Sequence, residues 1–222
     1  MACQPVVVDG SAIARTFWGM KWCANLKTCS DYAGRLSRGR SYVRNGAVLD
    51  LRVVTGIIEA LVCGEKVYKV KIGIREFSEQ AWNAILEECA GKVATLVELL
   101  QGRLSAAVME VVTRPGTGLL PPSRHIGFIC TCPDSTSMCT HVAAALYAVG
   151  NRLDSQPELL FLLRHVDPQD MVQRAARAPA ADATAASAEL DSADLSALFG
   201  IELDVPPAPV AKARKKQGGR LR

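Results

Sequence analysis

Residues 47–75 read AVLDLRVVTGIIEALVCGEKVYKVKIGIR, and this stretch decides the fold. Apolar and polar residues alternate in Ala47–Val54 and Val67–Arg75, whereas Ile57–Val62 is continuously apolar. Alternation with a period of two is typical of strands that are buried on one face. Turn-forming residues separate the three runs at Thr55-Gly56 and Gly64-Glu65-Lys66. Such short connections predict antiparallel neighbours.

A further turn is predicted at Asn45-Gly46, so that the residues before it form the first strand of a four-stranded meander. A two-residue turn would place Arg40 and Arg44 on the face that buries leucines. A three-residue turn with Gly46 left-handed instead pairs Arg40 with Asp50. This second register agrees better with burial, because it leaves the basic side chains facing outward.

Basic residues surround one tyrosine in this part of the chain, which is the composition of a nucleic-acid-binding patch. The predicted nucleic-acid-binding residues are Arg38, Arg40, Tyr42, Arg44 and Arg52. A solvated face with ordinary ion pairs is the alternative, and the sequence leaves it open.

Helical patterns flank the predicted strands. The predicted helices are Phe17–Leu36, Glu79–Ala90, Lys92–Leu100, Ser105–Val112, His141–Asn151 and Glu158–Arg164, with a further helix opened by Pro168 and a short strand at His125–Cys130. The expected fold class is α+β, an antiparallel β-meander with packed helices. The expected division is an α+β domain at 1–124, a zinc finger with its following helices at 125–177, and a tail at 178–222.

Four potential metal ligands lie within twelve positions and form a Cys-x-Cys-x6-Cys-x-His array. They are Cys130, Cys132, Cys139 and His141. Three thiolates and one imidazole are a common tetrahedral set for structural zinc, and they leave no position for a reactive water. The second ligand pair lies where a helix is predicted to begin, and the positive end of the helix dipole favours thiolates there. Two alternatives remain: a redox or enzymatic use of the three thiols, and four unrelated residues.

The array, followed by an alanine-rich helix, resembles the SWIM zinc finger, a ββα module of bacterial proteins, Mutator-type transposases and eukaryotic recombinase partners. Further segments are similar to bacterial SWIM zinc finger family proteins: Phe17-Trp18-Gly19 with Trp22-Cys23, the segment 39–46, and the segment 157–164. The resemblance covers roughly residues 15–170, and Ser135 departs from the family pattern without touching the ligands. It implies zinc binding and contacts with DNA or proteins. In bacteria it also implies a helicase-like ATPase of the chromatin-remodeller type encoded nearby.

The end of the chain differs from the rest in composition. Residues 178–203 hold five acidic residues and no basic one, whereas 204–222 hold six basic residues and one acidic. Few core-forming residues occur, which predicts disorder. Within it, the segment 190–203 carries Leu195, Leu198 and Phe199 at helical spacing, which predicts a short amphipathic helix that binds a partner. Docking of this helix on its own domain is the alternative.

Composition excludes several classes of protein. The chain has 222 residues, 49% of them hydrophobic, and a formal net charge of +4. We expect neither a signal peptide nor a membrane span, and therefore a cytoplasmic bacterial protein in which the cysteines stay reduced. Common catalytic motifs are absent from the sequence. The predicted function is thus a zinc-binding, non-enzymatic adaptor without a small-molecule substrate, which contacts DNA or a DNA-processing partner such as a helicase-like remodelling ATPase.

Overall fold

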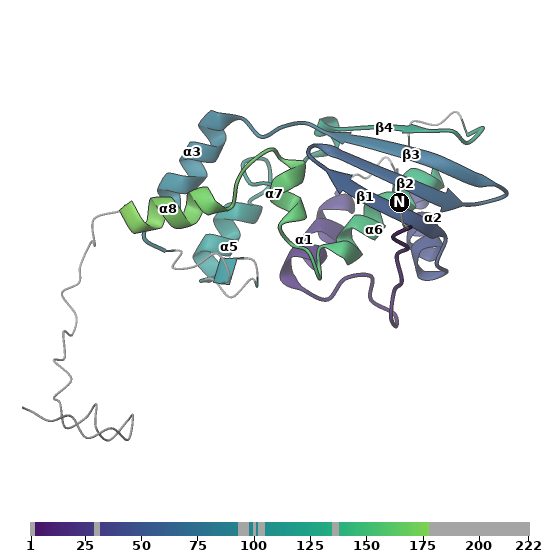
Figure 1. Ribbon diagram of the computed structural model, residues 1–222, viewed down its shortest axis with the longest axis horizontal. Helices are drawn as coiled ribbons and strands as arrows, with labels where there is room; N and C mark the ends of the chain where they lie inside the picture. The colour runs from purple at the N-terminus through teal and green to yellow at the C-terminus, as the bar shows by residue number, and fades with distance from the viewer. Residues whose placement is uncertain are drawn as a thin grey trace, which may run out of the picture. The chain divides into compact units, whose positions relative to one another are not determined.

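Four antiparallel strands form one sheet in the order β1-β2-β3-β4 (Figure 1). The strands are β1 (Val48–Val54), β2 (Ile57–Cys63), β3 (Val67–Ile74) and β4 (Ile126–Cys130). The computed structural model describes residues 3–28, 32–92, 98–99, 101, 105–134 and 138–177. The sheet and the helices around it confirm the α+β class and the four-stranded antiparallel sheet.

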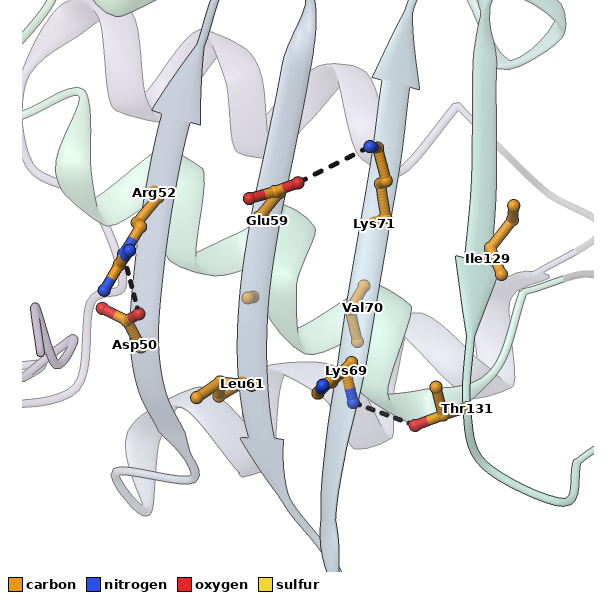
Figure 2. A pocket seen from close by; sticks show the side chains of 10 residues that line it. Asp50, Arg52, Glu59, Leu61, Lys69, Val70, Lys71, Ile129 and Thr131 are labelled. Atoms are coloured by element: carbon orange, nitrogen blue, oxygen red, sulfur yellow. Dashed lines mark hydrogen bonds and ion pairs between the residues drawn. The ribbon is translucent and has the colours of Figure 1, made fainter. Parts of the chain in front are cut away.

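Side-chain alternation gives the sheet a buried inner face and an exposed outer face. In β3, Tyr68, Val70, Ile72 and Ile74 are buried, while the residues between them are exposed. The inner face packs on helix α6 (Thr140–Arg152), which contacts all four strands. Figure 2 views the outer face, with α6 behind the strands.

The fourth strand is not the one that the sequence predicted. Residues 40–44 belong to helix α2 (Ala33–Arg44), and the predicted hairpin at Asn45-Gly46 is wrong. Asn45 is the C-cap of α2 and Gly46 has φ 70°, so this pair ends a helix. The fourth strand is β4 instead, which pairs with β3 from Ile74↔Ile126 to Val70↔Cys130.

The predicted helix Phe17–Leu36 is likewise corrected, because helix α1 ends at Leu26 (Phe17–Leu26) and α2 begins at Ala33. Both helices pack closely on α6 through small residues. A Cβ on Gly39 would lie 2.5 Å from the Cβ of Ala143, and a Cβ on Gly19 would lie 2.4 Å from the carbonyl oxygen of Gly150. Helix α6 is therefore enclosed by the sheet, α1 and α2, and its residues from Val142 to Gly150 are all buried.

The remaining helices agree with the sequence prediction to within a few residues. They are α3 (Glu79–Glu88), α5 (Ala106–Thr113), α7 (Leu159–Leu163) and α8 (Gln169–Arg177). A 3-10 turn, η2 (Ser123–His125), precedes β4 and was not predicted. The predicted cap of α3 is confirmed, because the side chain of Ser78 accepts a hydrogen bond from the backbone nitrogen of Ala81. The indole nitrogen of Trp82 donates to Asp170 at 2.9 Å and joins α3 to α8.

Two predicted segments fall wholly or mostly outside the described residues: the helix at 92–100 and the tail at 178–222. Among the helices that the structure does describe, none combines the length and the apolar character that crossing a bilayer requires.

Candidate metal centre

The four predicted ligands meet at the junction of β4 and α6. Cys130 is the last residue of β4, and Cys132 follows two residues later. Cys139 is the N-cap of α6, and His141 lies in its first turn. One ligand atom from each of these four residues lies within 4.8 Å of the other three. The cluster can therefore hold a metal ion.

The distances within the cluster are compatible with a tetrahedral ion. The Nδ1 atom of His141 lies 3.9 Å from the sulfur of Cys130 and 3.8 Å from the sulfur of Cys139. Typical zinc–sulfur and zinc–nitrogen bond lengths place such atoms about 3.6 Å apart at tetrahedral corners. The two histidine–cysteine distances need to shorten by only a few tenths of an ångström, whereas the four ligand atoms, which lie within 4.8 Å of one another, would draw closer around a bound ion. The donor set is compatible with zinc.

Burial sets the protonation of the ligand side chains. It raises the pKa of the Cys130 thiol to about 12 and also raises the pKa of Cys139. It lowers the pKa of His141, against a smaller opposing effect of Asp134, so the imidazole is neutral at pH 7. A neutral imidazole is ready to bind a cation, whereas the thiols must first release protons. The position of Cys139 at the N-terminus of α6 favours the thiolate that results.

The imidazole of His141 is held between two tyrosines and a turn. Its ring centroid lies 4.5 Å from the Tyr68 ring and 5.7 Å from the Tyr42 ring, whose edge it meets at 73°. A Cβ on Gly64 would lie 2.7 Å from the Nε2 atom of His141. The turn between β2 and β3 thus approaches the ring so closely that only glycine leaves the ring in place.

Two further contacts connect the ligand loop to its neighbours. Arg35 of α2 forms an ion pair with Asp134 at 2.6 Å, two residues after the ligand Cys132. On the outer face of the sheet, the backbone nitrogen of Lys69 donates to the hydroxyl of Thr131 at 3.0 Å (Figure 2). Thr131 lies between the first two ligands, so β3 holds the backbone that carries both.

The predicted nucleic-acid-binding residues do not form one patch. Arg38 is exposed on α2, and Tyr42 lies against the metal cluster. Arg40 and Arg44 are four residues apart on another side of α2. There the Cζ atom of Arg40 lies over the Tyr147 ring, 5.4 Å from the ring centroid.

Arg52 lies on the outer face of the sheet and pairs with Asp50 at 3.0 Å (Figure 2). It is therefore separated from the four residues of α2. The predicted partner-binding residues Leu195, Leu198 and Phe199 lie outside the described residues.

Sequence reasoning missed the residues that surround the ligands. Tyr68 was assigned only to the buried face of a strand, and Gly64 only to a turn. The alternation of β3 did indicate that Tyr68 points inward, but no local signal connects either residue to His141, which lies more than 70 positions later in the chain.

Comparison with known proteins finds a mycobacterial relative. The chain is 32% identical over 179 residues to the uncharacterized protein Rv2102 of Mycobacterium tuberculosis. The aligned region is 79% of this chain and 64% of the relative, so the chain spans less than two thirds of the length of the relative. No family model and no solved structure matches the chain.

Proposed function

We propose that this chain is a zinc-binding, non-enzymatic adaptor that contacts DNA, a DNA-processing partner such as a helicase-like remodelling ATPase, or both. The observation that carries the proposal is the set of four protein ligands within 4.8 Å of one another. Four protein ligands fill a tetrahedral zinc site and leave no open position for a water or a substrate. The role of the ion is then structural.

A ββα arrangement of the finger is part of the proposal. Strand β4 leads into the first ligand pair, and α6 begins with the second. The second strand would be β3, which pairs with β4 although it precedes it by about 50 residues. Together with the resemblance to SWIM zinc fingers, this arrangement favours a finger that is built into the sheet.

The pKa directions of Cys130 and Cys139 disfavour a redox use of these two thiols. Reactive and redox-active cysteines have a lowered pKa, because the thiolate is the attacking species. Burial has the opposite effect here, raising the pKa of Cys130 to about 12 and that of Cys139 above its ordinary value. A bound cation would instead stabilise the thiolates and keep them unreactive.

Helix α2 supports the proposed contact with DNA. Its sequence AGRLSRGRSYVR carries four arginines and no acidic residue. One row along the helix holds Arg35, Arg38 and Tyr42. In this row, Arg35 pairs with Asp134 of the ligand loop and Tyr42 contacts the His141 ring. Another side holds Arg40 and Arg44. Arginines in rows along one helix can neutralise successive phosphates.

The metal is tested by elemental analysis of protein purified without chelators. We expect one zinc per chain in the wild type and a loss of zinc in Cys139→Ser. Cys63→Ser is the matched control, because Cys63 is exposed and is not a ligand. Wild-type protein without zinc would contradict the proposal.

The DNA contact is tested by fluorescence anisotropy with labelled duplex DNA from 50 to 200 mM salt. Each neutralised phosphate contributes a slope of about −0.9 in log K against log salt. We expect the double variant Arg40→Ala/Arg44→Ala to bind more weakly with every DNA sequence, since phosphate contacts carry no base information. Arg114→Ala is the control, because Arg114 pairs with Glu88 elsewhere in the molecule. Equal binding by wild type and double variant would contradict the assigned DNA contact.

A further inference from the structure

A surface hollow of about 320 Å³ lies between the segment 12–14, α1, α2 and one residue of α6. Its basic lining residues are Lys27, Arg40 and Arg44, and its less polar lining residues include Met20, Cys23 and Tyr147. Neither the resemblance nor the metal centre accounts for this hollow.

The charges of the hollow are unbalanced. Three of its lining residues are cationic and none is acidic. In the part of the chain that the structure describes, five other basic side chains form ion pairs with carboxylates, whereas Lys27, Arg40 and Arg44 form none. Like charges that gather without a carboxylate repel one another, so an anion in the hollow would relieve that repulsion.

Other contacts orient the two arginines without using up their donors. The guanidinium of Arg40 stacks on the Tyr147 ring and lies 3.5 Å from its hydroxyl oxygen. An Nη atom of Arg44 donates to the carbonyl oxygen of Ser11. A guanidinium has five N–H donors, so each arginine keeps several for a ligand. Planar groups held in this way suit a phosphate, whose oxygens accept paired hydrogen bonds.

The ends of two helices oppose this charge only in part. Lys27 is the C-cap of α1, and Arg44 is the last residue of α2. A helix C-terminus carries about half a negative charge, and cations there stabilise the helix. Two such ends offset about one of the three positive charges in the hollow, so a net attraction for anions remains.

We propose that this hollow binds a backbone phosphate of a single-stranded or frayed nucleic-acid segment, with the attached sugar or base against the exposed side chain of Met20. The inference rests on the proposed DNA contact and adds Lys27, which lies on α1 outside the predicted nucleic-acid-binding set. A volume near 300 Å³ is at the lower end of ligand pockets and limits the occupant to about one nucleotide.

The test compares two lysine variants of the same helix. Lys27→Ala removes a charge from the hollow, whereas Lys21→Ala removes one that lies over the Phe17 ring, outside the hollow. Both variants have the same net charge, so general electrostatic attraction changes equally. The probe is a 3′-labelled dT12, with and without a 5′-phosphate, and binding is measured by anisotropy from 50 to 200 mM salt.

We expect Lys27→Ala to weaken dT12 binding about tenfold at 50 mM salt, and to lower the salt slope by about 0.7. Lys21→Ala should lose only the small general attraction that one charge contributes. The 5′-phosphate should make no difference, because the proposed ligand is a backbone phosphate; a requirement for it would overturn the proposal in favour of a terminal phosphate.

Equal binding by the two lysine variants would overturn the proposal, while the broader DNA contact would stand. If wild-type protein binds neither dT12 nor duplex at 50 mM salt, the DNA contact itself fails and this proposal fails with it. The two failures are thus distinguishable by the behaviour of the wild type.

Discussion

Substitution of Gly64 tests the geometry of the metal centre most directly. A Cβ at this position would lie 2.7 Å from Nε2 of His141 and 3.0 Å from a ring carbon of Tyr68. Ordinary non-bonded contacts are about 3.5 Å or longer, so in Gly64→Ala the imidazole must move by roughly 0.8 Å. The φ of Gly64 lies outside the left-handed region, so the alanine adds no backbone strain of its own.

The cost of this movement falls on the metal-bound state. Without a metal, only packing against Tyr42 and Tyr68 opposes a shift of the His141 ring away from the new methyl group. With a metal, Nδ1 is fixed by a bond whose length tolerates about 0.2 Å. Disturbing groups that orient a ligand typically weakens metal binding 10- to 100-fold, which corresponds to about 1.4–2.7 kcal/mol. We expect a loss of zinc affinity in this range for Gly64→Ala.

The assay is a competition titration with a chromophoric zinc chelator, accompanied by thermal unfolding of the metal-free proteins. Gly73→Ala is the matched control, because Gly73 lies in β3 with no atom within 4 Å of its added Cβ. The control should keep its zinc affinity and gain up to about 1 kcal/mol of stability, since alanine suits a strand better than glycine. Wild-type zinc affinity in Gly64→Ala would refute the assignment of His141 Nδ1 as a ligand atom.

Three other outcomes are expected. Chelation should raise amide hydrogen exchange between Cys130 and His141, while β2 stays protected in the core, and exchange that rises equally in both would contradict a local role of the metal. Zinc affinity should fall about tenfold or more for each pH unit between 8 and 6, because protons compete for thiols whose pKa is raised by burial, and the same chelator titration measures this. Deletion of 179–222 should leave zinc content and melting temperature nearly unchanged but abolish co-purification with an ATPase or other DNA-processing partner, whereas a large loss of stability would show that the segment belongs to the core.

The sheet was largely predictable because its strands carry their burial pattern locally. In Val67–Ile74 every second residue is apolar, and these are the residues that face α6. Helix α2 was not predictable in the same way. Tyr42 and Val43 favour strands, and Asn45-Gly46 is a common hairpin turn as well as a common helix end. The helix is favoured by tertiary packing, including the close fit of Gly39 against Ala143, residues about 100 positions apart.

The cluster of four potential metal ligands was predictable for a different reason. Their chemistry is rare, and the spacing alone places two pairs at either side of a short loop. The surroundings of the ligands could not be read from the sequence, because Gly64 and Tyr68 approach His141 only when β3 and α6 pack together. The basic residues were found by composition. Their separation onto different sides of α2 and onto the outer face of the sheet was not predictable, because residues 40–44 were predicted to form a strand and belong to α2 instead.

Helix α2 connects the metal centre to the basic hollow. It meets the centre at two points, through the Arg35–Asp134 ion pair and through the edge of Tyr42 on His141. Its other side supplies Arg40 and Arg44 to the hollow. Because Gly39 lies directly on α6, a shift of α2 cannot be absorbed by soft side chains at the crossing. In the proposed function, an ion that fixes the start of α6 and the ligand loop would therefore also fix both arginines relative to Tyr147, so that the proposed structural metal and the proposed anion-binding hollow would depend on one packed helix pair.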